Sequence, residues 1–313
     1  MSECQGLKTR TFMKLAFLIT AHNDPTHLQR LTNSLPESAH FFVHVDAKSD
    51  MEPFLKTVTN PRVHFVQHRV NVMWGSLGVV DSQMYALKEA LEYDIDFDYF
   101  ISMSGLDYPL WDNERIDAFF SAHPDREYLY GIRMKDQNKQ VKDLYLHYRF
   151  FNSYYWPYGS LGSKFRVSLR ELTFALGVRK PLSFVAEKKQ YDLYKGAMWW
   201  AITRDLAAFA YDTWKNNKKY VEYFKTSFAP DETFIPTLVF NTEFRSRALP
   251  SPKTFTDLES VTPLTFIDYT QGIKILDESD LPRLIASGKM FCRKTITGHS
   301  DRLMDLIDER REG

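Results

Sequence analysis

Two acids stand just beyond apolar runs that have the composition of buried strands. Asp107 follows the run 99–103 after a Ser-Gly turn, and Asp46 lies near the end of the run 41–48. In open α/β sheets, ligands bind outside the carboxyl ends of the strands, so we expect both carboxylates at one rim of a sheet, as candidate ligand-binding groups. His22 follows another such run and could touch a nucleotide there, although a capping or merely hydrogen-bonded histidine fits the sequence equally well.

A second pair of acids, Asp231 and Glu232, opens a predicted helix directly after Pro230. Paired carboxylates are residue types that can carry acid–base chemistry. Asp231 has the side chain of a helix cap, and Glu232 would lie in the first turn, where the helix dipole favours a charged acid. The stretch by itself leaves two interpretations open: a functional pair, or two ordinary first-turn acids.

Arg293 and Lys294 form a compact double positive charge after an apolar pair. Such a pair suits a diphosphate, because guanidinium and ammonium groups bind phosphate oxygens, but an ordinary surface pair has the same sequence. Trp74 and Gly75 lie in a loop just before the predicted helix 76–93. A ring beside a backbone-permissive glycine can stack on a base or a sugar, and a structural plug is the alternative.

The charge balance and the aromatic content point to a polar ligand other than nucleic acid. The 313 residues include 40 basic and 40 acidic side chains, and this net charge of zero gives no sign of nucleic acid as a bulk partner. Aromatic residues make up 15% of the chain, and in the segment 135–189 they alternate with arginines and lysines. Single-stranded nucleic acid is one ligand for such a surface. We expect instead a wall for an extended substrate such as a glycan, with a ring-rich core as the alternative.

The elements that would position these residues alternate along the chain. Apolar runs predict strands at 13–20, 41–48, 63–66, 99–103, 127–132 and 264–269, and apolar spacing predicts helices from Pro25 and over 76–93, 113–122 and 205–215. The alternation predicts an α/β fold with a mostly parallel sheet. Ser76 is the expected cap of its helix, and Pro109 is expected to end strand pairing after the run 99–103.

Several chemistries have no motif in this sequence. The first β-α-β unit lacks the Gly-rich phosphate loop of dinucleotide folds, and no H-E-x-x-H, G-x-S-x-G or Walker-type sequence occurs. Cys4 and Cys292 are too few for a disulfide framework, which favours a reducing compartment. The apolar run 15–20 is too short for a signal sequence or a membrane span. We therefore expect a cytoplasmic protein without a transmembrane segment, and peripheral contact with a membrane stays open.

Taken together, these stretches resemble glycosyltransferase family 14, which contains the core-2/I-branching β-1,6-N-acetylglucosaminyltransferases and the peptide O-xylosyltransferases. The motifs that carry the resemblance are 44–48, 74–76, 104–110, 196–203, 230–234 and 291–294. They occur in the order of the family from about residue 14 to residue 296, which is nearly the whole chain. The ordered set is specific, although no single motif in it is.

The resemblance implies a GT-A-like fold, with a Rossmann-type mixed sheet flanked by helices in one domain at 13–296. The nucleotide would bind to the half 13–132 and the acceptor to the catalytic half 133–296, with a helical tail at 297–313. It also implies a UDP-sugar donor, inversion at the anomeric carbon, and catalysis without a bound metal or other cofactor.

Site residues follow from the same resemblance, position by position. Glu232 is expected to be the general base. The expected donor-binding residues are His22, Asp46, Trp74, Gly75, Ser104, Asp107, Arg293 and Lys294, and the expected acceptor-binding residues are Asp107, Tyr108, Trp199, Trp200 and Asp231. One departure concerns a basic residue that relatives often have where this chain has Thr265. Either Arg293 or Arg245 takes over that role, or the argument for metal-free catalysis is weaker here.

The resemblance thus predicts an inverting transferase of the bacterial type that moves N-acetylglucosamine or xylose from a UDP-sugar to a hydroxyl group of a glycan or polysaccharide acceptor. Two other interpretations stay open. One is a metal-dependent transferase of the same fold, with Asp107 at the metal. The other is a glycan-binding protein that keeps the aromatic cleft and does not catalyse transfer.

Overall fold

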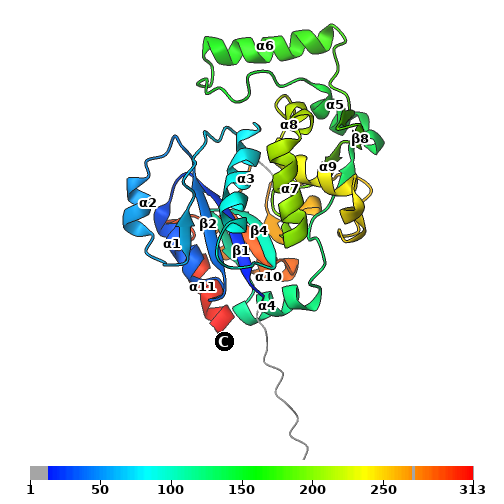
Figure 1. Ribbon diagram of the computed structural model, residues 1–313. Helices are drawn as coiled ribbons and strands as arrows, with labels where there is room; N and C mark the ends of the chain where they lie inside the picture. Colours follow the sequence, from blue (N-terminus) through cyan, green and yellow to red (C-terminus); the bar gives the residue numbers. More distant parts are fainter. Residues whose placement is uncertain (1–12, 270–271, 313) are drawn as a thin grey trace, which may run out of the picture.

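A five-stranded sheet forms the centre of the protein within the part of the chain that the computed structural model describes, residues 13–269 and 272–312 (Figure 1). Its order is β10 (Ala201–Thr203), β4 (Tyr99–Ser104), β1 (Leu15–Ala21), β2 (His40–Val45) and β3 (Val63–Phe65). The last four strands are parallel to one another, and β10 runs antiparallel to β4. The predicted α/β fold with a mixed sheet is therefore confirmed.

Alternate residues of β1 enter two different hydrophobic clusters because successive side chains of a strand point to opposite faces. Leu18 belongs to a cluster that includes Met84 of α3 (Gly78–Leu91), and Phe17 to one that includes Leu28 of α1 (Pro25–Asn33). Helices thus cover both faces of the sheet. This explains why the central strands are apolar runs instead of alternating polar and apolar residues.

The remaining helices flank this sheet or lie beyond it. They are α2 (Glu52–Thr57), α4 (Asn113–Ala122), α5 (Lys139–Leu146), α6 (Leu161–Ala175), α7 (Arg204–Asn216), α8 (Lys218–Phe224), α9 (Phe234–Phe240), α10 (Leu281–Ser287) and α11 (Asp301–Glu312). Short 3-10 helices are η1 (Met134–Asp136), η2 (Pro230–Glu232), η3 (Glu243–Ser246), η4 (Glu259–Val261) and η5 (Glu278–Asp280). In the described ranges, no helix is both long and apolar enough to cross a membrane.

A second sheet joins the end of the chain to the region after β4. Its order is β11 (Thr265–Ile267), β12 (Phe291–Arg293) and β5 (Asp107–Pro109). β5 ends at Pro109, as expected, but the short strand itself was not predicted: β5 pairs antiparallel with β12 and places Pro109 opposite Phe291. Pro109 is tolerated because β5 is an edge strand of this sheet, where a residue without an N–H group leaves no ladder partner unpaired.

Two local expectations were wrong. The stretch 127–132 is not a strand: Glu127 and Tyr128 make isolated bridges, and only β6 (Ile132–Arg133) pairs, with β9 (Tyr194–Lys195). Ser76 is not the cap of α3, because Leu77 holds that position, although the Ser76 hydroxyl accepts a hydrogen bond from the Gly78 amide at 3.2 Å. In both places, tertiary contacts decide the local geometry instead of local propensity.

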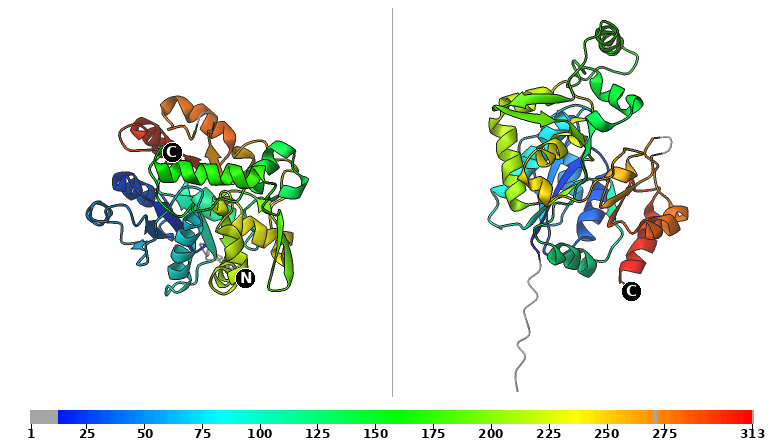
Figure 2. Two further views of the ribbon diagram at one scale, coloured as in Figure 1. Left: turned by 90° about the horizontal axis from the view of Figure 1, so that it is seen from above. Right: turned by 90° about the vertical axis from the view of Figure 1, so that its right-hand side faces the viewer.

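The segment 146–180 projects from the body of the molecule and carries α6 at its far end. Figure 1 shows α6 at the end opposite the C-terminus, and the right-hand view of Figure 2 shows the same separation. Below it lies the two-stranded hairpin of β7 (Ser183–Ala186) and β8 (Lys189–Asp192). No side chain of α6 is buried, whereas every other helix of eight or more residues in the described ranges buries at least one.

Candidate functional site

A hydrogen-bond network centred on Asp46 lies at the carboxyl end of β2. The Asp46 carboxylate accepts hydrogen bonds from the ammonium and the amide of Lys48, at 2.6 and 3.0 Å, and from the Val72 amide at 3.3 Å. The Arg69 guanidinium donates to the carbonyl oxygens of Asp46 and Ser49. These contacts hold the loops after β2 and β3 together, and they place two cations beside the rim of the sheet.

His22, which follows β1, lies within electrostatic reach of the same group. Partial burial lowers the pKa of His22, the positive charge of Arg293 lowers it further, and the Asp46 carboxylate opposes this. Lys294 and Lys48 act in the same direction as Arg293. The carboxyl ends of β1, β2 and β12 therefore bring positive charges together around His22, which suits a multiply charged anion.

Arg293 is held by the fully buried carboxylate of Asp107. Its Nη1 donates to Asp107 Oδ1 at 3.1 Å, while Oδ2 accepts from the Ser104 amide at 2.7 Å and from Trp199 Nε1 at 2.9 Å. Burial raises the pKa of the Asp107 carboxyl, and the charge of Arg293 opposes that rise. With donors on both oxygens and no exposed surface, Asp107 fixes Arg293 and Trp199 in place and is not in contact with solvent.

Glu232 lies in η2, just before α9, and forms an ion pair with Lys195 of β9. The Lys195 ammonium contacts Oε2, and Oε1 has no hydrogen-bond partner among the described residues. Burial alone would lower the pKa of Lys195, but the Glu232 carboxylate and the Tyr145 hydroxyl outweigh it and raise that pKa. The Gly196 amide also donates to the Glu232 carbonyl at 2.8 Å, so backbone and side chain both fix this glutamate.

Asp231 does not cap a helix. Thr233 precedes α9 and makes no side-chain cap, while Asp231 Oδ1 is buried with no hydrogen-bond partner in the described part of the chain. Burial raises the pKa of the Asp231 carboxyl, and the neighbouring Glu232 carboxylate raises it further. A raised pKa and a buried oxygen without a partner, next to Glu232, are features that cluster at functional sites.

The five residues 195–199 connect the acidic and the cationic parts of this site. Lys195 binds Glu232 at one end of this stretch, and Trp199 binds Asp107, and through it Arg293, at the other. Four residue steps span at most about 14 Å even when fully extended. β10 runs antiparallel to β4, so the residues before it lie at the carboxyl end of β4, and this one stretch links Glu232 to the Asp107–Arg293 pair.

Trp74 is exposed over 82% of its surface in the loop before α3. Gly75 beside it adopts a φ of +70°, a conformation that side-chain-bearing residues rarely adopt. The loop is held from one side, where the Asn152 amide donates to the Gly75 carbonyl at 3.1 Å, and the Trp74 ring meets the edge of Phe228 at 6.1 Å. A large exposed ring on an anchored loop is available for stacking.

Other expected site residues lie elsewhere. The Tyr108 hydroxyl donates to Asp308 Oδ2 at 2.8 Å and accepts from Arg30 Nε at 3.0 Å. Trp200 is 1% exposed and belongs to the core on the α3 side of the sheet. Tyr108 thus contacts α1 and α11, and Trp200 has almost no accessible surface.

The structure also places Ser104, and it places Thr265 and the two arginines that could replace a basic residue there. Ser104 is buried at the end of β4, where its amide serves Asp107. Thr265 is buried in β11. Arg245 lies in η3, beyond the end of α9 that is distant from Glu232. Two arginines were proposed to replace a basic residue at Thr265. Of these, Arg293 is the one that lies near His22, together with Lys48 and Lys294.

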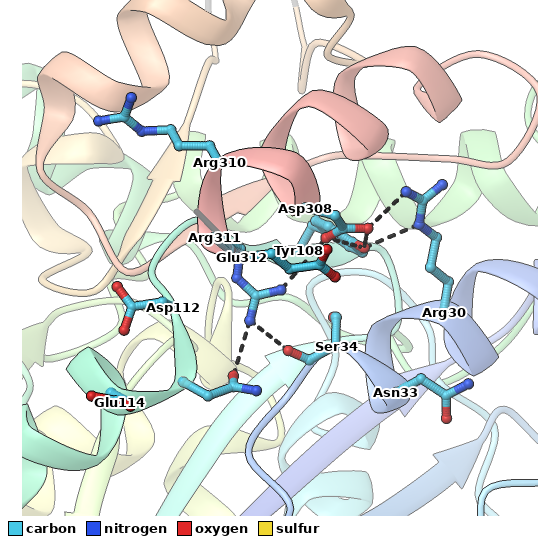
Figure 3. A pocket seen from close by; sticks show the side chains of 11 residues that line it. Arg30, Asn33, Ser34, Tyr108, Asp112, Glu114, Asp308, Arg310, Arg311 and Glu312 are labelled. Carbon is cyan, nitrogen blue, oxygen red and sulfur yellow. Dashed lines mark hydrogen bonds and ion pairs between the residues drawn. The ribbon is translucent and has the colours of Figure 1, made fainter.

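A cavity of about 640 Å³ lies away from this region, between the end of α1, the start of α4 and the end of α11 (Figure 3). The close-up shows Tyr108, Asp308 and Arg30 joined by hydrogen bonds, and Arg311 reaching toward Ser34. Of its charged side chains, Asp308 is paired with both Arg30 and Arg311. Apart from Tyr108, none of the expected site residues lines this cavity.

Three residues at this site were not expected from the sequence: Lys195, Lys48 and Arg69. A signal for Lys195 was present: it stands beside the apolar stretch 197–202, and a buried lysine needs a partner. Within the described ranges, no three histidine, cysteine, aspartate or glutamate side chains come together as a metal site would require.

A comparison with known protein families identifies the family of this chain. The model of the Core-2/I-Branching enzyme family matches residues 15–284. Rat xylosyltransferase 1 is 28% identical over 125 residues, which are 37% of this chain and 15% of the rat protein; the xylosyltransferase of Ciona intestinalis is 23% identical over 130 residues, 40% of this chain and 15% of that protein. The aligned part is thus a small share of these longer relatives.

Among solved structures, the crystal structure of S. aureus TarS 1-349 in complex with UDP-GlcNAc overlaps 41% of this chain and 36% of TarS, with 16% identity and a TM-score of 0.29. A likeness at that level supports no conclusion about this chain. The family match covers most of the chain and includes both Asp107 and Glu232. The chain therefore belongs to the Core-2/I-Branching enzyme family.

Proposed function

We propose that this protein is an inverting glycosyltransferase that moves N-acetylglucosamine or xylose from a UDP-sugar to a hydroxyl group of a glycan acceptor, without a metal ion. The observation that carries the proposal is the joining of Glu232 to the Asp107–Arg293 pair through residues 195–199. One short stretch thus connects a carboxylate that can accept a proton with cations that can hold a diphosphate. The names of the xylosyltransferase relatives support xylose as one of the two sugars.

Glu232 is the proposed general base. Its Oε2 is held by Lys195, which leaves Oε1 to receive the proton of the acceptor hydroxyl. As that proton moves to Glu232, the acceptor oxygen forms a bond to the anomeric carbon, and the bond from that carbon to the diphosphate oxygen breaks with its electron pair going to UDP. Attack from the face opposite UDP inverts the configuration in one step, so no sugar bound to the enzyme is formed.

Arg293 and Lys294 are the proposed partners of the leaving diphosphate. Negative charge grows on the diphosphate in the transition state, so cations already fixed beside it stabilise the transition state more than the bound substrate. Arg293 is pre-positioned by Asp107, and the Lys294 ammonium makes no ion pair or hydrogen bond in the part of the chain that the structure describes. Asp46, His22 and Trp74 are the proposed nucleotide-side contacts, and Asp231 the proposed acceptor contact.

A metal-dependent transferase with Asp107 as the ligand is less consistent with the geometry. Both oxygens of Asp107 already accept hydrogen bonds, and the side chain is fully buried. A metal at that position would have to displace Arg293 from a buried carboxylate. We therefore propose a positioning role for Asp107 and propose that Arg293 and Lys294 do the work that a divalent cation does in metal-dependent transferases.

The decisive experiment compares Glu232→Gln with native protein. The variant should lose about 10² to 10⁴ in kcat because it cannot accept the proton, while calorimetry should give an unchanged Kd for UDP. Glu243→Gln, at an exposed glutamate beyond α9, is the matched control and should keep full activity. Turnover by Glu232→Gln close to that of native protein would remove Glu232 from this role.

The sugar and the stereochemistry are tested with a panel of UDP-sugars. Thermal shift should single out UDP-N-acetylglucosamine or UDP-xylose, and NMR of the product of an α-linked donor should show a β-linkage. Retention of the α-configuration would contradict direct displacement. A protein that binds glycans but gives no heat with UDP would be the non-catalytic glycan-binding protein instead.

We also propose that the protein works in the cytoplasm of a bacterium and builds a surface or secreted glycan. In support, Cys292 is fully buried and unpaired in the described chain. Fractionation of cells that express the protein would test the location, and activity in a periplasmic or culture fraction would contradict it.

A further inference from the structure

The helix α6 presents its apolar side chains to solvent. Leu161, Phe165 and Leu172 of the helix and Leu176 directly after it are exposed over 87, 56, 56 and 72% of their surfaces. At about 100° per residue, these four positions fall within roughly 60° of one another around the helix axis, so they form one stripe. A helix on a water-soluble protein normally turns such a stripe toward the core.

Positions outside this stripe pack on other residues of the segment 146–180, whereas Val167, on the opposite face, is 43% exposed. Gly162 lies against the Trp156 ring so closely that a Cβ atom there would sit 2.7 Å from it. The Arg166 guanidinium lies 5.9 Å from the same ring, and Phe174 stacks on His147 at 3.8 Å between ring centroids. These contacts orient the helix and leave the stripe largely exposed, with the Phe165 ring 6.3 Å from that of Phe151.

Basic and aromatic side chains surround the stripe. In the segment 146–180, the exposed or partly exposed basic residues are Arg149, Lys164, Arg166, Arg170 and Arg179, and Glu171 is the single acid, whereas Lys180 is buried. Tyr154, Tyr155 and Tyr158, just before the helix, are exposed over 61, 65 and 104%. Exposed leucine and phenylalanine, flanking lysine and arginine, and nearby tyrosine are the features of a helix that lies in the plane of a membrane surface.

We propose that α6 docks on the surface of an anionic lipid bilayer. Its apolar stripe, Leu161, Phe165, Leu172 and Leu176, would lie in the boundary between headgroups and acyl chains. An apolar stripe offers no hydrogen bonds to a glycan, so the sugar acceptor is not what covers it. The excess of basic over acidic side chains in the segment favours lipid headgroups of negative charge. This inference stands apart from the transfer reaction, because it concerns where the protein is held.

The docking surface is tied to the candidate active site by the loop before α6. The Asn152 side chain donates to the Gly75 carbonyl at 3.1 Å, next to Trp74, and the Arg149 amide donates to the Thr226 carbonyl at 2.9 Å. Thr226 lies a few residues before Asp231 and Glu232. A bilayer bound to α6 would therefore hold the site near the membrane surface, where an acceptor carried on a lipid would be at high local concentration.

Sedimentation with lipid vesicles tests the proposal on the full chain. The probes are vesicles of phosphatidylcholine alone and vesicles in which about one quarter of the lipid is phosphatidylglycerol. We expect native protein to sediment with the anionic vesicles and to be released by salt. The double variant Phe165→Glu/Leu172→Glu should bind them at least about 10-fold more weakly, because two charges are placed on the stripe.

The matched control is Leu55→Glu/Val185→Glu, which places two charges at apolar side chains exposed over 60 and 63% elsewhere on the molecule. Its vesicle binding should equal that of native protein, and thermal unfolding should show that both double variants fold. Absence of native binding, or equal binding by the stripe variant, would overturn the proposal. Equal binding to neutral and anionic vesicles would overturn its charge component.

A second copy of the chain is the other possible partner of the stripe, and the molecular mass in solution would reveal it. If native protein fails to bind vesicles but sediments as a dimer, and the stripe variant sediments as a monomer, the stripe is a contact between two copies of the chain and the membrane proposal is overturned. Vesicle binding does not require turnover. Its failure is therefore distinguishable from failure of the proposed transferase activity.

Discussion

Lys195 and Glu232 form an ion pair in which the side chain of the lysine is 5% exposed and that of the glutamate 20%. The lysine is thus buried behind the carboxylate, and the glutamate is the member of the pair that an acceptor can reach. A buried charge that loses its partner is strongly unfavourable, so each residue holds the other in place.

We expect Lys195→Met to lower kcat by about 10- to 100-fold, because the Glu232 carboxylate loses the group that orients it. The KM for the UDP-sugar should stay within about two-fold, since Lys195 does not face the donor in the proposed mode. Steady-state kinetics separates the two quantities. Lys180→Met removes an equally buried lysine that binds the Tyr223 carbonyl, and it should leave kcat unchanged.

Arg293 and Lys294 are adjacent but should respond differently to substitution. Arg293→Met leaves the buried Asp107 carboxylate without its cation, so we expect a loss of about 3–5 kcal/mol in the free energy of unfolding. Lys294→Met breaks no ion pair in the described ranges and should unfold like native protein while its Kd for UDP rises. Chemical denaturation and calorimetry measure the two effects. Equal stability of the two variants would contradict the positioning role of Asp107.

Trp74→Ala should weaken donor binding without affecting stability. The ring is exposed over 82% of its surface, so little packing is lost, whereas stacking on a base contributes about 1–3 kcal/mol. We expect the Kd for UDP to rise about 10- to 100-fold in calorimetry. Tyr158→Ala, at another exposed ring, is the control and should bind UDP as native protein does.

Removal of divalent metal should leave transfer intact. Cationic side chains are the proposed partners of the diphosphate, so activity after treatment with EDTA should equal activity before it. The measurement is the initial rate of UDP release with and without added Mn²⁺. A rate that requires Mn²⁺ would contradict metal independence and would direct attention to Asp46 as a ligand.

The stability of the protein should fall in acid because His27 is buried as a neutral side chain. It lies between the Gly105 carbonyl at 3.0 Å and the Thr295 hydroxyl at 2.7 Å, and burial lowers the pKa of His27 to about 4. The unfolded chain binds a proton near pH 6.5 and the folded chain does not, so stability is full above that pH and is lost as the pH falls toward 4.

The loss attributable to His27 amounts to about 3 kcal/mol across this range. Denaturation at several pH values should show the slope, and His27→Gln should reduce it whatever its effect on absolute stability. His123→Gln, at an exposed histidine, should keep the native slope. An unchanged slope in His27→Gln would show that His27 is protonated in the folded state.

The central strands and most of the helices could be predicted from local sequence. β1, β2 and β4 are apolar runs because both faces of the sheet are covered, and α3, α4 and α7 repeat their apolar residues at the helical period. The places of Asp46 and Asp107 just after β2 and β4 were predictable for the same reason. The strand β5 was not predicted, and the stretch 127–132 and the capping role of Asp231 were mispredicted, because there the pairing partner or the burial is supplied by distant residues.

The sequence alone determined the family, the order of the strands and helices, and the residue types available for chemistry, since these depend on local pattern and on motif order. Tertiary structure decided which charges meet. Lys195 and Glu232 are 37 residues apart in the chain, and Asp107 and Arg293 are 186 apart. Each pair forms only because folding buries one of its members, and a buried charge must find its partner in space whatever the distance along the chain.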